Sequence, residues 1–449
     1  MLSKKFSIKI NDKINSFSKS IQVDSDKSLS IRSFLIGSIC EKVSLAKNVL
    51  ESEDVFSTIN CLKKLGVTIK KDKNGAYAIH GKGLGSLFSK KNLTLNFGNS
   101  GTLARLLIGI LSTTPDIEVN LIGDSSLNKR NMEKLIKLMS YFGAEFLPKN
   151  RFNFPLKLIS TEMPLGIEYE AGVSAQLKSA VILAGLNSFG ITKIIEKKRS
   201  RDHTENILIK NKRSIKIKKG KNKLIEVFGK KQLKPFTLSI PGDPSSAAFF
   251  TALTLLSQNS YLKIKNVGLN PTRIGFYELL IKHGANIKFF NKRNKNNETV
   301  GDIIVKSSKL KKPLKSTKDF YEKTTDEFPI LFCIAALTKG ISVFKGIKDL
   351  ANKESNRIKE MQKILKQIGI KSIAKSDELR IYGQNFLSNK NKKINVPKLG
   401  DHRICMSSTI LSLVTGIRAK INNFETVKTS SPNFLKKIKY LGGKFEIQN

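Results

Sequence analysis

The sequence predicts an α/β fold of two domains, each built from three copies of one repeated unit. Three observations lead to this prediction: the length of the chain, a helix–glycine–strand phrase that recurs along it, and a second series of strongly apolar helices behind polar turns. A chain of 449 residues exceeds what one hydrophobic core usually supports, so two domains are expected.

The first repeated phrase is an amphipathic stretch, followed by a glycine and a short strand-like run, as in "CLKKLGVTIKK" and "LLIKHGANIKFF". Glycine or asparagine suits the left-handed conformation that ends a helix, and the alternating run after it predicts a strand. Successive copies lie 68 to 85 residues apart, too far for a solenoid repeat. The positions after the six helices are Gly66, Gly143, Asn211, Gly284, Gly369 and Gly442.

The second phrase is a polar turn that leads into a strongly apolar helix. Helices this apolar around their circumference must be buried on nearly all sides, with the amphipathic helices and the strands outside them. Six such helices suit two domains of three units each. They are expected at residues 26–40, 98–111, 174–186, 242–256, 325–337 and 401–414.

Proline and glycine punctuate the chain near its middle, in "SIPGDP" at 239–244, where a domain boundary is expected. The N-terminal domain is expected at residues 23–241, and the C-terminal domain at residues 1–22 and 242–449. Three lysine-rich stretches are interpreted as tolerated surface loops: residues 210–223, 291–299 and 386–398.

The formal net charge of +44 raises the possibility of a nucleic-acid partner. Against this, the lysines are spread along the whole chain, and aromatic residues do not interleave with the basic runs. We therefore expect no nucleic-acid partner and interpret the charge as a bias of solvated loops. The longest apolar run, residues 328–337, is about half of a membrane span, and no signal peptide is predicted. A cytoplasmic protein with no membrane partner is expected.

The four cysteines stand singly in apolar contexts, at Cys40, Cys61, Cys333 and Cys405. No two of them have metal-ligand spacing, so buried thiols are expected and no metal site is predicted.

Several polar turns combine unpaired helix N–H groups with a cation, the combination that binds anions. In "NFGNSGTLARLL" a glycine-rich turn exposes the backbone and Arg105 adds a donor; "SDKSLSIRS", "SAQLKSA" and "DHRICM" repeat the arrangement. Each turn alone is equally compatible with a capped helix. The series together predicts a shared site for an anionic ligand.

Carboxylates interrupt this series at Asp326, Glu327 and Glu354. Acids at helix starts usually serve the helix dipole, yet an acid among phosphate-binding cations can act as a general base or acid. His203, in "SRDHTE", has the same ambiguity, and a structural role is favoured for it.

Taken in order, these strings resemble the enolpyruvyl transferase family, and within it the bacterial class II form that uses shikimate 3-phosphate. The resemblance runs over residues 19–432 and includes "FGNSGT", "SAQLKSA", "SRDHTE", "GDPSSAA", "NPTRIG", "DEFPIL", "KESNRI" and "DHRI". It implies an inside-out α/β barrel in each of two domains, with the active site in the cleft between them. It also implies a monomer that needs no metal and no organic cofactor.

The implied reaction transfers the enolpyruvyl group of phosphoenolpyruvate to the 5-hydroxyl of shikimate 3-phosphate and releases phosphate, in the route to chorismate and the aromatic amino acids. The alternative is transfer to UDP-N-acetylglucosamine. That sister enzyme uses a loop cysteine and begins with a lysine–asparagine motif; here no cysteine lies in a polar loop of the first domain, and "DKSLSIRS" fits shikimate 3-phosphate better.

The resemblance also implies roles for individual residues. Asp326 would take the proton of the 5-hydroxyl, while Glu354 and Lys27 would handle proton transfer at the enolpyruvyl methylene. Shikimate 3-phosphate would be bound by Lys27, Ser28, Arg32, Ser174, Ala175, Gln176, Arg201, Asp326 and Lys353. Phosphoenolpyruvate would be bound by Lys27, Gly101, Arg130, Gln176, Arg357 and Arg403.

The sequence departs from the family's usual pattern at a few positions. Ser25 replaces a glycine, Asn356 an aspartate and Ser431 an aromatic residue. The loss of charge at Asn356 is expected to weaken the orientation of Arg357. Gly101 is kept, which implies room for the inhibitor glyphosate beside the phosphoenolpyruvate pocket.

Overall fold

The computed structural model describes residues 5–385 and 392–448, and the chain divides into two units. The N-terminal unit comprises residues Ser25–Ile240 and Lys295–Glu298; the C-terminal unit comprises Met1–Asp24, Pro241–Asn294 and Thr299–Asn449. Residues 295–298, expected in the C-terminal domain, group with the N-terminal unit. Asn296 donates to the Thr237 carbonyl and Asn297 to the Asn206 carbonyl, so these residues cluster with the N-terminal unit.

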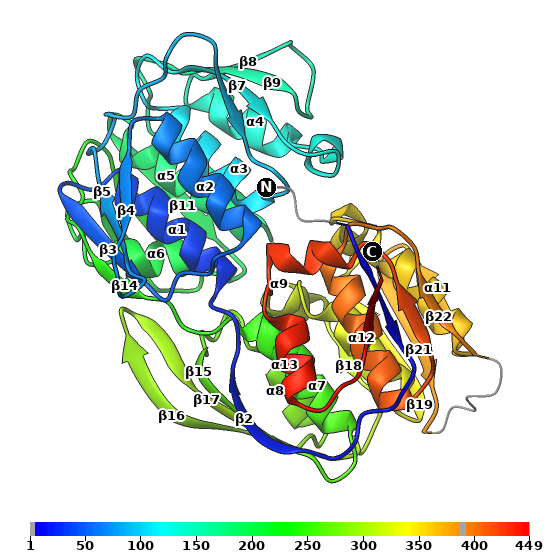
Figure 1. Cartoon of the computed structure of the whole chain (residues 1–449). Helices are drawn as coiled ribbons and strands as arrows, with labels where there is room; N and C mark the ends of the chain where they lie inside the picture. The colour runs from blue at the N-terminus through cyan, green and yellow to red at the C-terminus, as the bar shows by residue number, and fades with distance from the viewer. Residues whose placement is uncertain (1–4, 386–391, 449) are drawn as a thin grey trace. The chain divides into compact units, whose positions relative to one another are not determined.

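Three four-stranded sheets form the outside of the N-terminal unit, in the orders β14-β3-β5-β4, β6-β7-β9-β8 and β10-β11-β13-β12 (Figure 1). Their strands are β3 (Val43–Lys47), β4 (Thr68–Lys71), β5 (Tyr77–His80), β6 (Leu93–Asn96), β7 (Glu118–Ile122), β8 (Glu145–Leu147), β9 (Leu156–Ile159), β10 (Glu168–Ala171), β11 (Ile191–Glu196), β12 (Ile215–Lys218), β13 (Lys223–Phe228) and β14 (Thr237–Ser239). Their helices are α1 (Lys27–Ser38), α2 (Glu53–Lys64), α3 (Gly101–Leu111), α4 (Glu133–Tyr141), α5 (Ala175–Leu186) and α6 (His203–Leu208), with the short helix η1 (Leu127–Lys129).

The C-terminal unit repeats this plan with the sheets β16-β17-β15-β2, β18-β19-β21-β20 and β22-β23-β1-β24. Its strands are β1 (Ser7–Ile10), β2 (Ser18–Gln22), β15 (Tyr261–Gly268), β16 (Ile287–Lys295), β17 (Glu298–Lys306), β18 (Lys315–Ser316), β19 (Gly340–Lys345), β20 (Ser372–Lys375), β21 (Glu378–Gly383), β22 (Ile394–Val396), β23 (Ala419–Ile421) and β24 (Glu446–Gln448). Its helices are α7 (Pro244–Leu256), α8 (Gly275–Lys282), α9 (Tyr321–Thr324), α10 (Phe328–Ala336), α11 (Arg357–Gln367), α12 (His402–Thr415) and α13 (Phe434–Tyr440), with the short helices η2 (Lys318–Phe320), η3 (Lys348–Asn352) and η4 (Phe424–Thr429).

One pattern of pairing recurs in these sheets. In the sheet that contains β6, strand β6 runs parallel to β7, which pairs antiparallel with β9, and β9 pairs antiparallel with β8. The parallel pair is joined through the buried helix α3, because parallel strands need a long crossover connection. The repeated units predicted from the sequence are therefore confirmed. The N-terminal and the C-terminal unit each have their own hydrophobic core.

The six apolar helices predicted from the sequence are α1, α3, α5, α7, α10 and α12. All nine residues of α10 are buried, and α3, α7 and α12 are buried along nearly their whole length. The amphipathic helices, such as α2 and α11, bury one face only. Buried helices inside outer sheets are the inside-out arrangement that the resemblance implied.

Strands β2 and β14 each join the sheet of a repeated unit other than the one that follows them in the chain. Strand β2 comes directly before α1, yet it pairs in parallel with β15, where Lys19 lies opposite Leu262. Strand β14 comes directly before α7 and pairs in parallel with β3, where Leu238 lies opposite Ala46. This exchange places residues 1–24 in the C-terminal unit.

The glycines of the repeated phrase have the predicted conformation. Gly66, Gly143, Gly284, Gly369 and Gly442 all have positive φ, between 78° and 104°. Asn211 is the exception: it is not among the residues with positive φ, and the prediction for it is wrong. Helix α6 ends at Leu208 and leaves through a turn in which the Asn211 N–H donates to the Leu208 carbonyl, so a left-handed residue is not needed there.

Two of the three lysine-rich stretches contain strands, so their interpretation as loops throughout is wrong, whereas the strand predicted after Asn211 is confirmed as β12. Residues 210–223 include β12 and the start of β13, and residues 291–299 lie in the β16–β17 hairpin. Most side chains of β16 face water, and a strand exposed on one face carries lysines without disturbing the core. Of the third stretch, residues 386–391 lie outside the described part of the chain and β22 covers 394–396.

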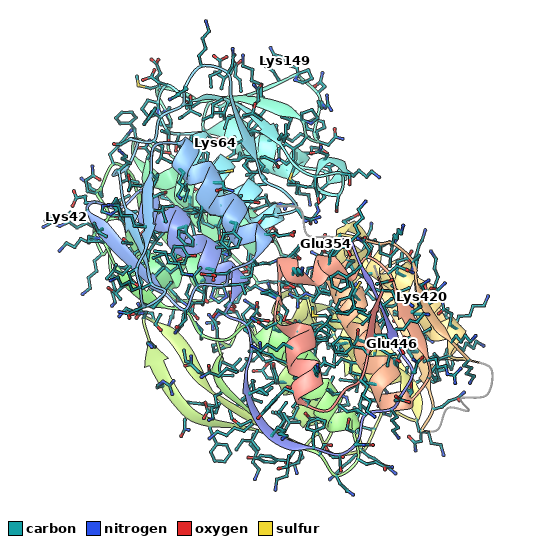
Figure 2. All side chains as sticks on the ribbon, viewed as in Figure 1. Lys42, Lys64, Lys149, Glu354, Lys420 and Glu446 are labelled. Carbon is teal, nitrogen blue, oxygen red and sulfur yellow. The ribbon has the colours of Figure 1, made fainter. Side chains whose placement is uncertain are left out.

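Lysines elsewhere also point into solvent. Lys42, Lys64, Lys149 and Lys420 are exposed and project from the ribbons that carry them (Figure 2). In the described part of the chain, no helix is both long and apolar enough to cross a membrane.

Candidate active site

The first turns of the three buried helices of the N-terminal unit begin with a capping side chain. Asp26 accepts from the Leu29 N–H, Ser100 from Leu103 and Ser174 from Leu177. One N–H of each helix start is satisfied in this way. The others in each first turn face the end of the helix, where the dipole favours an anion.

Neutral oxygens orient Arg32, one turn into α1. Its Nε donates to Thr204 Oγ1 at 2.9 Å, Nη2 to Ser179 Oγ at 3.1 Å and Nη1 to the Ser28 carbonyl at 3.2 Å. Thr204 in turn donates to Ser179. These bonds fix the guanidinium and join α1, α5 and α6.

Gly101 lies between two arginines at the start of α3. A Cβ atom at this position would lie 2.8 Å from Nη1 of both Arg105 and Arg130. Arg105 donates to the Gly101 carbonyl at 3.0 Å, and Arg130 to the Asn99 amide oxygen at 2.8 Å. The glycine-rich turn therefore lets two cations approach the helix end closely, which suits a small, doubly charged anion.

The remaining predicted residues of the N-terminal unit lie at the same helix ends. The Gln176 amide donates to Thr102 at 3.0 Å, which joins the start of α5 to the start of α3. Ser174 and Ala175 begin α5, and Arg201 lies in the turn before α6. Lys27 begins α1 and pairs with Asp54 at 2.9 Å. The structure therefore brings together the predicted residues on α1, α3 and α5.

Lys178, which the "SAQLKSA" motif offered as an anion ligand, has a different role. It is fully buried, and its Nζ lies 2.7 Å from both Glu196 and Glu205. Burial opposes its charge, but the two carboxylates raise the pKa of Lys178. Burial also opposes the charge of Glu205, yet Lys178 and Lys223 lower the pKa of Glu205 to about 2. This ion cluster joins α5 to α6 and serves the packing of the unit.

In the C-terminal unit, carboxylates surround Arg357 at the start of α11. Its Nε donates to Asp401 at 3.0 Å and Nη2 to Glu354 at 2.6 Å, while Nη1 lies 3.8 Å from Asp326. Burial opposes the charge, but these three carboxylates raise the pKa of Arg357 above its ordinary value. The arginine is therefore fixed as a cation, and it holds two of the predicted catalytic carboxylates, Asp326 and Glu354, around one point.

Arg403, in the first turn of α12, is 4% exposed and has unused donors. Its Nε and Nη1 are buried with no hydrogen-bond partner in the part of the chain that the structure describes. The guanidinium lies over the Phe249 ring, 5.8 Å from its centre. A buried cation with unused donors is costly unless a ligand supplies acceptors.

Lys353 lies beside Asp349 and Tyr321. Its Nζ is 2.7 Å from Asp349, and the Tyr321 hydroxyl donates to the same carboxylate at 2.6 Å. Burial, and after it the charge of Asp349, raise the pKa of Tyr321, so its phenol stays neutral. Asp349 and Tyr321 thus orient Lys353, and no motif indicated either of them.

Asn356 was expected to weaken the orientation of Arg357, but Arg357 is well oriented by other residues. Its amide oxygen accepts from the Lys359 N–H and caps α11, while Asp401 orients Arg357. Asp401 also caps α12 and accepts from Ser355 Oγ. Asp401 was not predicted as a site residue, although it stands in the "DHRI" motif two residues before Arg403. Thr204, which orients Arg32, likewise stands in the "RDHTE" motif.

His203 has the structural role that was favoured for it. Its Nδ1 lies 2.7 Å from Glu298 Oε1, and both side chains are buried. The four cysteines are free and buried, as predicted. In the described ranges 5–385 and 392–448, no cluster of three or more histidine, cysteine, aspartate or glutamate side chains could hold a metal ion.

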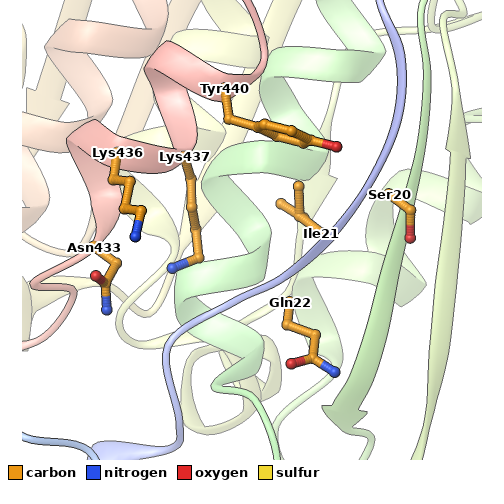
Figure 3. A pocket seen from close by; sticks show the side chains of 7 residues that line it. All are labelled: Ser20, Ile21, Gln22, Asn433, Lys436, Lys437 and Tyr440. Atoms are coloured by element: carbon orange, nitrogen blue, oxygen red, sulfur yellow. The ribbon is translucent and has the colours of Figure 1, made fainter.

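A pocket of about 280 Å³ lies elsewhere in the C-terminal unit, between β2 and α13. Figure 3 shows the ring of Tyr440 at one side of it and Lys436, Lys437 and Asn433 at the other. Lys437 is engaged with Asp24 at 3.3 Å. None of the seven residues that line the pocket is a predicted site residue.

The helix ends of both units thus present anion-binding groups, and one unit adds carboxylates. A family model of EPSP synthase (3-phosphoshikimate 1-carboxyvinyltransferase) matches residues 11–438. The chain belongs to the EPSP synthase family.

Relatives of this family match over almost the full chain. A 3-phosphoshikimate 1-carboxyvinyltransferase from Zymomonas mobilis is 38% identical, covering 98% of this chain and 97% of the relative. A solved EPSP synthase from Acinetobacter baumannii has a TM-score of 0.84 and 34% identity, covering 99% of this chain and 100% of that one. An enolpyruvyl transferase from Streptomyces tendae, 13% identical over 99% of each chain with a TM-score of 0.76, shares the fold.

Family membership makes the protein a transferase of the shikimate route to chorismate and the aromatic amino acids. It transfers an enolpyruvyl group from phosphoenolpyruvate to shikimate 3-phosphate, and UDP-N-acetylglucosamine is not favoured as the acceptor. The inside-out α/β fold of repeated units is likewise that of the family.

Proposed function

We propose that the anion-binding groups of the two units form one active site, in the cleft between them, and that each predicted residue has the role the family implies. The observation that carries this proposal is the cluster of carboxylates around the Arg357 guanidinium. Asp326 and Glu354, the two carboxylates assigned to proton transfer, both lie against this one cation.

The N-terminal unit would hold shikimate 3-phosphate and the phosphate of the second substrate. Arg32 and Arg201 would meet shikimate 3-phosphate, together with Lys27, Ser28, Ser174, Ala175 and Gln176 of the first turns of α1 and α5. Gly101 and Arg130 would receive phosphoenolpyruvate, with Gln176 and Lys27 reaching both substrates. Arg105 and Arg130 beside Gly101 support this division, because arginines form charge-assisted hydrogen bonds to phosphate groups.

The C-terminal unit would supply the acid–base groups and the grip on the carboxylate of phosphoenolpyruvate. Arg357 and Arg403 would bind phosphoenolpyruvate, and Lys353 would contact shikimate 3-phosphate. The unused donors of Arg403 support this assignment.

The 5-hydroxyl oxygen of shikimate 3-phosphate would bond to the central carbon of phosphoenolpyruvate, and Asp326 would accept the proton that this hydroxyl loses. Lys27 and Glu354 would deliver a proton to the methylene and later remove one as the carbon–phosphate oxygen bond breaks. Carboxylates stabilise the positive charge that develops on the carbon, and cations stabilise the departing phosphate. The residues named here need no metal and no organic cofactor for these steps.

A phosphate-release assay tests the proposed function. Phosphoenolpyruvate with shikimate 3-phosphate should release phosphate, whereas phosphoenolpyruvate with UDP-N-acetylglucosamine should not. Release with the second acceptor would overturn the assignment.

A single site with ligands on both units also requires the units to close on the substrate. Small-angle scattering with saturating shikimate 3-phosphate should therefore give a smaller radius of gyration. An unchanged radius would contradict a shared cleft.

The monomeric state, the cytoplasmic location and the lack of a nucleic-acid partner also stay predictions. Light scattering at micromolar concentration, cell fractionation and a nucleic-acid retention assay test them in turn.

A further inference from the structure

Four residues with no assigned role in the reaction, drawn from three of the sequence motifs, meet at one buried point of the C-terminal unit. "GDPSSAA" supplies Asp243 and Ser245 at the start of α7, "NPTRIG" supplies Arg273 ahead of α8, and "DEFPIL" supplies Glu327 at the start of α10. Arg273 Nη2 donates to Asp243 at 3.1 Å and to Ser245 Oγ at 3.0 Å. Ser245 Oγ donates to Glu327 Oε1.

Burial makes this network costly to disturb. Glu327 is 1% exposed, and Ser245, Arg273 and Asp243 are all buried. A carboxylate removed from water needs hydrogen bonds and a nearby cation, which Ser245 and Arg273 provide. Tyr277, whose hydroxyl donates to the Pro244 carbonyl, is also buried beside the network. Burial, and after it the charge of Glu327, raise the pKa of Tyr277, so its phenol stays neutral.

Asp326 precedes Glu327 in the chain, but its side chain lies toward different partners. The Asp326 side chain is 24% exposed and lies 3.8 Å from Arg357. Glu327 stands at the N-cap position of α10 without making a side-chain cap bond to that helix. Its carboxylate is committed to Ser245 instead, so a bond to another helix fixes the turn that carries Asp326.

We propose that Glu327 is a positioning residue for Asp326. The hydrogen bond between Glu327 and Ser245, beside Arg273, fixes the turn that carries Asp326. The Asp326 carboxylate is thereby held near Arg357, in the position from which it accepts the substrate proton. This proposal rests on the general-base role proposed for Asp326. The three motifs then have a single purpose, because α7, α8 and α10 meet where that turn begins.

A displaced Asp326 would change turnover and its pH dependence. Arg357 and the phenol of Tyr321 face it, while Glu354 and Asp401 share Arg357. The positive charge of Arg357 favours the ionised form of Asp326. If the carboxylate moves away from Arg357, its pKa rises, and the acidic limb of the kcat profile moves to higher pH.

The test compares Glu327→Ala and Glu327→Gln in the full-length enzyme. Glu327→Ala should lower kcat by roughly 10- to 100-fold, since a displacement of about 1 Å can cost that much. The KM values should change less than about threefold, and the acidic limb should move to higher pH. Glu327→Gln keeps an oxygen that accepts from Ser245, and it should recover most of kcat and the wild-type limb.

Ile334→Ala, on the same helix and fully buried, is the matched control for lost stability. It should keep kcat and the acidic limb below its melting temperature. An equal loss of kcat in Ile334→Ala, or a wild-type limb in Glu327→Ala, would overturn the proposal. If Glu327→Ala does not fold, Ser245→Ala removes only the hydroxyl and should move the limb in the same direction.

Asp326→Asn separates this proposal from the one on which it rests. If Asp326→Asn keeps its turnover, the general-base role is wrong. If Asp326→Asn loses turnover while Glu327→Ala keeps both kcat and the limb, only the positioning role is wrong.

Discussion

The two units orient their arginines with different partners. In the N-terminal unit, neutral oxygens of Thr204, Ser179 and Asn99 accept from Arg32 and Arg130. In the C-terminal unit, the carboxylates of Asp401, Glu354 and Asp326 surround Arg357. A neutral acceptor orients an arginine without forming an ion pair with it. A carboxylate forms an ion pair with the arginine, and the arginine in turn fixes the position of the carboxylate. The comparison teaches that uncharged acceptors orient arginines in the N-terminal unit, whereas in the C-terminal unit one arginine holds Asp326 and Glu354 around a single cation.

Asp326→Asn is the largest test of the C-terminal side of this comparison. An amide cannot accept the hydroxyl proton, so kcat should fall by roughly 10²- to 10⁴-fold. Phosphate release measures kcat, and circular dichroism checks the fold. Near-normal turnover in a folded variant would remove Asp326 from the mechanism.

Glu205→Gln tests a buried cluster in which the N-terminal unit also places carboxylates around a cation, Lys178. The pKa of Glu205 is lowered to about 2 from an ordinary 4.5. The stability that this ionisation contributes is therefore present above about pH 4.5 and lost as pH falls toward 2. At pH 7 the variant should lose on the order of 3 kcal/mol of unfolding free energy.

Urea unfolding at pH 7 and at pH 3 measures this loss, which should shrink at the lower pH. Glu226→Gln, which removes a partner of the exposed Lys218, is the control and should change little. A loss for Glu205→Gln that does not depend on pH would assign the effect to packing rather than to charge.

Gly101→Ala sharpens the comparison at the phosphoenolpyruvate side. The new methyl would lie 2.8 Å from the ends of Arg105 and Arg130, which are flexible and must shift. We expect KM for phosphoenolpyruvate to rise roughly tenfold, about 1.4 kcal/mol, with kcat less affected. The inhibition constant of glyphosate should rise more than KM, because the family resemblance implies that it needs the same space.

Steady-state kinetics with and without glyphosate decide this prediction. Gly220→Ala is the control, since a Cβ there meets no atom closer than 3.5 Å. A wild type that tolerates glyphosate, or equal rises in both constants, would contradict it.

Thr204→Val tests the neutral orientation of Arg32 itself. The variant is nearly isosteric but leaves the Arg32 Nε–H without its acceptor, which costs about 1 kcal/mol. KM for shikimate 3-phosphate should rise roughly fivefold while kcat stays unchanged. Thr114→Val is the control, because the Thr114 hydroxyl donates only within its own helix region, to Ile110. A fall in kcat with an unchanged KM would mean that Arg32 acts in the chemistry.

The smallest effect is expected from the exposed lysines of β12 and its flanks. Changing Lys210, Lys212, Lys216, Lys219 and Lys221 to glutamine should alter both KM values by less than about twofold, because exposed charges are screened beyond roughly 8 Å. Lys223 must be left in place, since it contacts Glu196 and Glu205. A large rise in both KM values would show that these lysines steer anions to the site.

Local patterns were enough to predict the repeated helices, and distant partners explain what was missed. The burial of α3 or α10 follows from an unbroken apolar surface, and Gly66 or Gly284 marks a helix end by its own conformation. Strand β2 has nothing in "SKSIQ" to indicate β15, some 240 residues away. Its exchange with β14 depends on which edge is free in the folded unit.

The site shows the same limit. The motifs located Arg32, Gly101 and Arg403, since each stands at a helix start that the sequence reveals. The role of Lys178 could not be read from "SAQLKSA", because Glu196 and Glu205 decide it from other elements. The start of β16 was predicted from "NIKFF", but its continuation beyond residue 290 was missed because exposed side chains hide the alternation that predicts a strand.

Strand β1 has a consequence for the order in which the chain folds during synthesis. It pairs with β23 and β24, so Ile8 lies opposite Ile421 and Ile447. At 5–20 residues per second, the ribosome needs roughly 20–80 s to make those partners after β1. Most of the N-terminal unit can assemble once β14 has been synthesised. Until β15, β23 and β24 are made, strands β1 and β2 have no strands to pair with. The lysines in "SIKI" and "SKSIQ" suit this wait, because charged side chains discourage unpaired strands from joining those of other nascent chains.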